Sequence, residues 1–196
     1  MFRPLDQARC RRALRLPGNG RLVGFVGRFL PEKGIEDLLR AASRLGPSVR
    51  VLLVGSGPDL PRLIARAGTL GLGDRLIVRG AMARHRMPVV MGALDALVLP
   101  SRTWPEWKEQ FGRVLVEAQA CGRWALGSSS GEIPAIVAGR QLVFPEGESA
   151  RLARCLRTVL GRLPPPGLRP RILHRFSEEA VATATTRFLL ACRDGA

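Results

Sequence analysis

The sequence predicts a doubly wound α/β fold: a Rossmann-like domain in which helices cover both faces of one parallel β-sheet. Short apolar runs rich in leucine and β-branched residues recur along the 196-residue chain, and stretches with helical apolar spacing lie between them. Such alternation is typical of parallel sheets joined by right-handed crossovers. The predicted strands are Leu22–Gly27, Val49–Val54, Arg75–Val78, Ala96–Leu99, Trp124–Gly127 and Gln141–Phe144.

The helices follow from the spacing of their apolar residues. Apolar side chains recur at i, i+3, i+4 and i+7 after each of the first two strands, and another helix begins near Phe111–Gly112. A helix from Arg151 to Arg162 has arginines on one face and leucines on the other, so we expect its leucine face to dock on the sheet. The two matching sets are Ile35, Leu38, Leu39 and Ala42, then Leu60, Leu63, Ile64 and Ala67.

The chain divides into three expected segments. Residues 1–20 form a linker stub, residues 21–176 the Rossmann-like domain, and residues 177–196 a C-terminal helix. Consecutive prolines from Pro164 to Pro166 end the preceding helix. Ser177 is expected to cap the last helix, because the acidic Glu178 and Glu179 that follow suit its first turn.

The chain is strongly basic, with 31 Lys and Arg against 16 Asp and Glu and a formal net charge of +15. Only Lys33 and Lys108 are lysines, so 29 arginines are spread over nearly every segment. This spread indicates a coding bias. Aromatic residues make up 5% of the chain and no nucleic-acid-binding motif accompanies the charge, so we expect no nucleic-acid partner.

Cysteine spacing and hydropathy exclude other classes. The four cysteines form no C-x-x-C pair and have no histidine at ligand spacing, so we expect neither a metal site nor a disulfide framework. The N-terminus lacks an apolar signal segment, and we expect a cytoplasmic protein.

The arginine face of residues 151–162 leaves two interpretations open. It either makes peripheral contact with an anionic membrane or is simply solvated.

Candidate binding residues lie where predicted strands end, because ligands of doubly wound sheets bind beyond the carboxyl ends of the strands. Gly27 and Arg28 end the first strand, and Lys33 follows five residues later at the start of a helix. Two cations there can hold a phosphate group. The alternative is a solvated Arg28 and a Lys33 paired with Glu32.

Two carboxylates frame the start of the helix near Gly112. Glu109 lies just outside this helix and Glu117 within it, and the amides of the first turn are free to meet an anion. The alternative for Glu117 is an ordinary ion pair with Arg113 four residues earlier, and spacing alone does not separate the two. The loop of residues 128–134, which contains Ser130 and Gly131, suits either anion contact or a turn.

Together these segments resemble the C-terminal, nucleotide-sugar-binding half of glycosyltransferase family 4, retaining enzymes of the GT-B class. The resemblance spans nearly the whole chain, and its most specific part is the E-x7-E signature from Glu109 to Glu117. The other matching residues are Gly27-Arg28 with Lys33-Gly34, Val54-Gly55-Ser56-Gly57-Pro58, and Asp95 before Val98-Leu99-Pro100-Ser101.

The resemblance implies a retaining transfer of a sugar from a UDP- or GDP-sugar, with no metal and no cofactor. It implies that Arg28 and Lys33 bind the donor diphosphate, that Glu109 faces the donor sugar, and that Glu117 binds the ribose. We expect Glu109, Arg28 and Lys33 to be catalytic. The residues expected to bind the nucleotide are Glu117, Phe111, Gly112, Gly27, Arg79, Ser130 and Gly131.

The family's other half is an N-terminal domain that binds the acceptor, and residues Met1–Pro4 resemble the linker that follows it. We therefore expect half of an enzyme, inactive until a separate acceptor-domain chain completes it. The alternative is a non-catalytic nucleotide-sugar-binding subunit or a truncated fragment.

Overall fold

The computed structural model describes residues 1–194 and contains a six-stranded sheet in strand order β3-β2-β1-β4-β5-β6. Each recorded strand pair is parallel, which confirms the doubly wound α/β class. The strands are β1 (Arg21–Arg28), β2 (Val49–Ser56), β3 (Leu76–Arg79), β4 (Ala96–Leu99), β5 (Trp124–Ser128) and β6 (Val143–Phe144).

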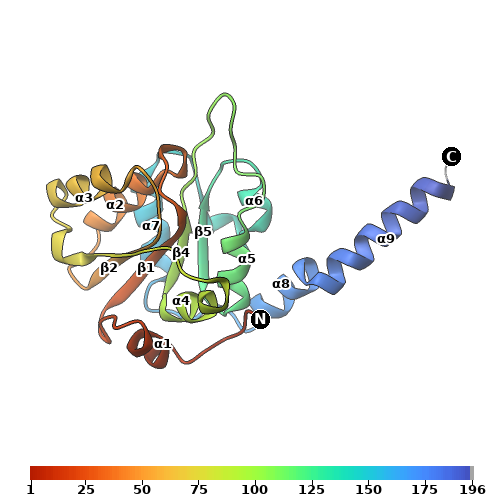
Figure 1. Ribbon diagram of the computed structural model, residues 1–196, viewed down its shortest axis with the longest axis horizontal. Helices are drawn as coiled ribbons and strands as arrows, with labels where there is room; N and C mark the ends of the chain where they lie inside the picture. Colours follow the sequence, from red (N-terminus) through yellow and green to blue (C-terminus); the bar gives the residue numbers. More distant parts are fainter. Residues whose placement is uncertain (195–196) are drawn as a thin grey trace.

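The helices form two layers, one on each face of the sheet (Figure 1). The chain runs outward from β1 to β3, then returns to place β4 beside β1, so right-handed crossovers put α4 and α5 on the face opposite to α2 and α3. α2, α3 and α7 pack on one side, and α1, α4, α5 and α8 pack on the other. The helices are α1 (Gln7–Ala13), α2 (Ile35–Ser43), α3 (Leu60–Thr69), α4 (Met87–Ala93), α5 (Arg113–Ala120), α6 (Ile133–Ile136), α7 (Ser149–Val159), α8 (Leu168–Phe176) and α9 (Glu178–Asp194).

The strand order reverses between β1 and β4, and this switch point positions the site. The loops that leave these two strands diverge to opposite faces of the sheet, which opens a crevice at their carboxyl ends. Residues 29–34 follow β1 and residues 100–112 follow β4. The predicted Lys33 and Glu109 therefore lie on neighbouring loops of the same edge.

Element boundaries in the second half of the domain differ from the prediction. The last predicted strand is shortened to two residues, because residues 140–142 form a 3-10 turn. α7 ends at Val159, before the predicted end at Arg162, and Leu163 beyond it is 84% exposed.

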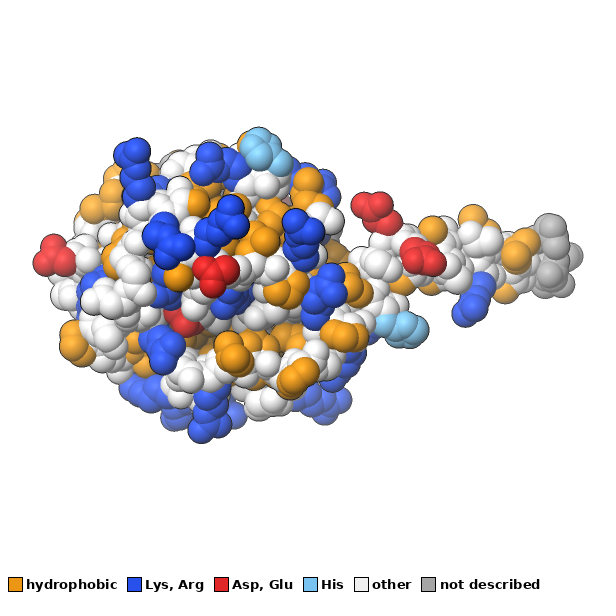
Figure 2. All heavy atoms as spheres, turned by 90° about the horizontal axis from the view of Figure 1, so that it is seen from below, with side chains coloured by type: hydrophobic (Ala, Val, Ile, Leu, Met, Phe, Trp, Pro, Cys, Tyr) orange, Lys and Arg blue, Asp and Glu red, His pale blue; other side chains and the backbone are white. Residues whose placement is uncertain are grey.

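α7 buries its apolar face as expected, since Leu152, Leu156 and Val159 are almost fully buried. The helix packs on α2 and β6, and its arginines remain exposed. Figure 2 shows Lys and Arg side chains scattered over one whole face of the molecule rather than gathered in a patch. The arginine excess is therefore a property of this surface at large.

The two ends of the chain differ in packing. Residues 1–20, expected as a linker stub, contain α1, which packs on α4 and buries Cys10. α9 extends away from the sheet (Figure 1), and the Ala180 amide donates to Ser177 Oγ at 3.1 Å, which confirms the predicted cap. Residues 195–196 of the expected C-terminal helix lie outside the described residues.

Candidate functional site

A charged cluster at the carboxyl edge joins the first and fourth strand loops. Lys33 Nζ lies 2.9 Å from Glu109 Oε2, and Ser101 Oγ donates to the same oxygen at 2.9 Å. The two charged side chains are only 19% and 13% exposed. Within residues 1–194 Lys33 forms no ion pair with Glu32. The structure thus joins two predicted catalytic residues that lie 76 positions apart.

Two glycines let the three loops around Glu109 converge. Gly34 has φ +61°, and a side chain there would strike the carbonyl oxygen of Pro100. Gly131 has φ +50°, and a side chain there would strike the carbonyl oxygen of Glu109. Glycine alone accommodates both the backbone conformation and the close approach. Gly131, predicted to contact the nucleotide, therefore packs directly on the Glu109 backbone.

The start of α5 supplies free hydrogen-bond donors. Gly112 is the residue before the helix, and the Leu115 amide donates to its carbonyl at 2.9 Å. Among the residues that the structure describes, none accepts a hydrogen bond from the amides of Arg113 or Val114. The first turn of a helix carries partial positive charge, so these amides favour an anion.

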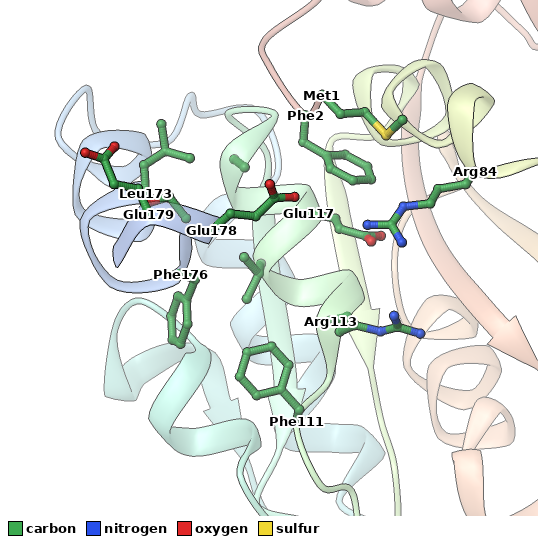
Figure 3. Close-up of a pocket in the computed structure, with 13 residues that line it drawn as sticks. Met1, Phe2, Arg84, Phe111, Arg113, Glu117, Leu173, Phe176, Glu178 and Glu179 are labelled. Atoms are coloured by element: carbon green, nitrogen blue, oxygen red, sulfur yellow. The ribbon is translucent and has the colours of Figure 1, made fainter. Parts of the chain in front are cut away.

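Glu117 lies further along α5 and lines a cavity of about 500 Å³ with Phe111. Figure 3 shows Arg84 and Arg113 on either side of Glu117 at one wall of this cavity. No ion pair shorter than 4.0 Å joins Glu117 to either arginine in the described part of the chain. The contact pair with Arg113 that spacing allowed is therefore not formed.

The electrostatics of Glu117 reflect that lack of a close partner. Burial raises the pKa of its carboxyl above the ordinary value, and the more distant charges of Arg113 and Arg84 oppose the shift only in part. A carboxyl in this state binds hydroxyl groups readily, because no guanidinium occupies its oxygens.

The other predicted residues divide between separate places. Arg28 is exposed at the end of β1 and, with Gly27, lines a second cavity of about 220 Å³. Arg79 ends β3 and donates to the Val78 carbonyl at 3.1 Å. Ser130 is fully buried, and its hydroxyl contacts that of Thr103 at 3.0 Å.

Phe111 packs edge-on against Phe176 of α8, with ring centroids 5.6 Å apart. Its side chain nevertheless remains 41% exposed and faces the cavity that holds Glu117. Phe111 therefore links the start of α5 to the C-terminal helices.

Three side chains of this region make contacts that sequence reasoning did not assign to them. Ser101 binds Glu109, Arg84 flanks Glu117, and Trp107 lies beneath the Lys33 ammonium with 4.4 Å between Nζ and the ring centroid. Ser101 and Arg84 follow the ends of β4 and β3. Their position after predicted strands at the carboxyl edge of the sheet could therefore have identified them as candidate site residues. Nothing in the spacing of Trp107 indicates its contact.

The described residues contain neither a candidate metal cluster nor a candidate membrane-spanning helix. Residues 1–194 hold no group of three or more His, Cys, Asp or Glu side chains suited to a metal ion. In the same part of the chain no helix is both long and apolar enough to cross a bilayer.

Comparison with known proteins identifies relatives of both sequence and fold. The family model described as "Glycosyl transferases group 1" matches residues 6–162. The D-inositol 3-phosphate glycosyltransferase of Mycobacterium leprae (strain Br4923) is 39% identical over 142 residues, which cover 70% of this chain and 32% of that protein. The chain thus spans about a third of the length of this curated relative.

Two solved structures show the same architecture. Sucrose-phosphate synthase from Thermosynechococcus elongatus superposes with a TM-score of 0.83 and 29% identity, covering 100% of this chain and 50% of that chain. The Anabaena protein HepE, solved in complex with UDP, superposes with a TM-score of 0.81 and 25% identity, covering 95% and 52% of the two chains.

Proposed function

Because the chain belongs to the glycosyl transferases group 1 family, we propose that it is the C-terminal, donor-binding half of a retaining glycosyltransferase of family 4. The donor is a UDP- or GDP-sugar, bound without a metal. The observation that carries this proposal is the Lys33–Glu109 pair beside the free amides at the start of α5. The UDP held by the HepE structure supports a nucleotide donor.

Each part of the donor has a proposed partner. The diphosphate binds Arg28, Lys33 and the amides that begin α5, since all of these favour negative charge. Glu109 accepts hydrogen bonds from the donor sugar and Glu117 from the ribose. The remaining contacts to the nucleotide are proposed to come from Phe111, Gly112, Gly27, Arg79 and Gly131. Ser130, predicted as a further contact, is fully buried against Thr103 and is not assigned one.

Lys33 and Glu109 are placed to share one donor molecule. Their charged groups contact each other at 2.9 Å, so each side chain neutralises the other and both are held in place. An arriving diphosphate sugar offers Lys33 a phosphate and Glu109 a hydroxyl. Binding therefore exchanges one charge-assisted contact for two.

The proposed reaction breaks the bond between the sugar C1 and the diphosphate oxygen. The acceptor hydroxyl oxygen bonds to C1 on the same face, and its proton passes to the departing phosphate oxygen. Arg28, Lys33 and the α5 amides stabilise the negative charge that develops on the leaving group. Transfer also requires an acceptor-binding domain, which is proposed to lie outside these 196 residues; they span about half of the solved relatives.

Thermal unfolding with UDP-glucose, GDP-mannose and ADP-glucose tests donor binding. A ligand that binds only the native state stabilises it by about 2.7 kcal/mol at a hundredfold excess over Kd, which raises Tm by roughly 5–10 °C in a chain of this size. We expect the UDP- or GDP-sugar to raise Tm. The absence of a shift with all three sugars would refute the proposal.

A further inference from the structure

The connection between β4 and α5 forms a tight turn that carries two tryptophans. Figure 1 shows this connection rising beyond the edge of the sheet. The Trp104 amide donates to the Trp107 carbonyl at 2.7 Å, and the Trp107 amide donates back to Trp104 at 3.1 Å. Residues that exchange both hydrogen bonds lie directly opposite each other with side chains on the same face. The two indoles therefore lie on one side of the turn.

The turn is held at its base by three sets of contacts. The amide and hydroxyl of Thr103 donate to the Glu146 carboxylate at 2.6 and 2.7 Å. The Arg102 guanidinium makes two hydrogen bonds to Asp37, at 2.8 and 2.6 Å. The Lys33 ammonium lies over the Trp107 ring. A surface that is ordered before its ligand arrives loses less conformational entropy on binding.

The two indoles and two carboxylates line one cavity of about 360 Å³. Its walls are Trp104, Trp107, Pro105, Glu32 and Glu106, and the Trp104 side chain is 49% exposed. Indole faces contact flat apolar surfaces, and carboxylates accept hydrogen bonds from hydroxyl groups. A pyranose ring has both features, an apolar C–H face and a rim of hydroxyls. The two carboxylates repel anions, so the cavity favours an uncharged sugar over a phosphorylated one.

We propose that Trp104 and Trp107 form a subsite for a neutral pyranose ring of the acceptor. This inference rests on the proposed function and adds the chemical class of the acceptor. Lys33 contacts both Trp107 and Glu109, so the subsite adjoins the proposed position of the donor sugar. An acceptor ring stacked there lies next to the reacting carbon of the donor.

Saturation-transfer NMR on the full chain tests the subsite with methyl glucoside, methyl galactoside and methyl mannoside as probes, with and without UDP. We expect at least one probe to bind with a millimolar Kd. Trp104→Ala weakens that binding about fivefold, the order of an aromatic contact, and Trp104→Phe retains part of it. Trp124→Phe is the matched control, because Trp124 begins β5 at the opposite edge of the sheet. It leaves saccharide binding intact.

The subsite is overturned if no probe binds, or if wild type and Trp104→Ala bind the probes equally. It is also overturned if Trp104→Ala loses affinity for UDP-glucose alone, because that result would assign the cavity to the donor sugar. UDP and UDP-glucose are titrated into the same wild-type and Trp104→Ala samples. UDP binding without saccharide binding contradicts the subsite and leaves the proposed function intact. Saccharide binding that depends on Trp104 without UDP binding supports the subsite and contradicts the proposed function.

Discussion

Glu36 and Glu117 are both half-buried carboxylates on helices that pack against the same sheet, yet their surroundings are opposite. Glu36 on α2 contacts three guanidinium groups, those of Arg40 and Arg66 at 2.7 and 2.9 Å and that of Arg62 at 2.5 Å. Glu117 on α5 contacts no guanidinium within 4.0 Å among residues 1–194.

The two pKa values express this difference. Burial alone would raise the pKa of Glu36, but hydrogen bonds from Arg40 and Arg62 outweigh it and lower the pKa to about 2. For Glu117 burial prevails and the pKa is raised. With 29 arginines, this chain has ample means to neutralise its carboxylates. In such a chain a half-buried carboxylate without a close arginine is a candidate binding residue, whereas the paired Glu36 stabilises the fold.

The largest change in fold stability is expected at Glu36, where three arginines converge on one carboxylate. Glu36→Gln removes the carboxylate that holds three guanidinium groups together and destabilises the fold by at most about 3 kcal/mol at neutral pH, since each pKa unit corresponds to about 1.36 kcal/mol. Because the folded pKa lies below the unfolded one, this stability is present above about pH 4.5 and is lost as the pH falls through about 2. Thermal unfolding across this range measures it.

Asp74→Asn is the control for that experiment. Asp74 is exposed and forms no ion pair within the described residues, so its loss leaves Tm nearly unchanged. If Glu36→Gln had the same Tm as Asp74→Asn at neutral pH, the ion pairs around Glu36 would be solvated surface contacts that do not stabilise the fold.

The next effect separates the two glutamates of the site. Glu109→Gln weakens binding of the nucleotide sugar more than that of the plain nucleoside diphosphate, because Glu109 is assigned to the sugar. Glu117→Gln weakens both about tenfold, in line with the loss of a hydrogen bond to a charged group. Calorimetric titration of UDP-glucose and UDP measures the four affinities. Identical losses for both ligands in both variants would contradict the assignment.

A smaller effect is expected on the pH dependence of stability. Because folding raises the pKa of the Glu117 carboxyl, the wild-type protein loses stability as the pH rises from about 4.5 through the folded-state pKa of Glu117. Glu117→Gln removes the buried charge, so its Tm relative to wild type is higher at about pH 7 than at about pH 4. The reverse order would mean that an ion pair with Arg113 stabilises the helix.

The smallest effect is expected on the arginine face of α7. Basic side chains are dispersed over the face that Figure 2 shows, and the 29 arginines are spread along the sequence. We therefore expect Arg151→Gln/Arg154→Gln to change co-sedimentation with anionic vesicles little at any salt concentration. Each charge near a membrane surface contributes about 1 kcal/mol. Loss of binding in this variant, seen with anionic but not neutral vesicles, would instead make α7 a membrane-contact face.

The sequence predicted most of the fold because the apolar periods of strands and helices are local patterns. It placed all six strands and the start of α5 within a few residues. It misplaced the end of α7, because the apolar spacing continues through Leu163 although the helix ends at Val159.

Sequence reasoning marked several residues of the candidate site, but neither their pairing nor the contacts of Ser101, Arg84 and Trp107. Strand ends marked Lys33 and Glu109 as neighbours on one edge, yet the local alternative paired Lys33 with Glu32. The observed pair depends on loop contacts that Gly34 and Gly131 permit, and no local spacing encodes them. The same holds for Arg84 and Phe2, which reach the Glu117 cavity from distant segments.

A diphosphate is proposed to bind between Arg28, Lys33 and the start of α5. Calorimetric titration of UDP and uridine into wild type, Arg28→Ala/Lys33→Ala and the control Lys108→Ala tests it most directly, since Lys108 is the other lysine of the chain and is exposed. We predict that the double variant loses about 100-fold or more in UDP affinity, from two charge-assisted contacts, and little in uridine affinity. Equal losses for the two ligands, or a similar loss in Lys108→Ala, would contradict the claim.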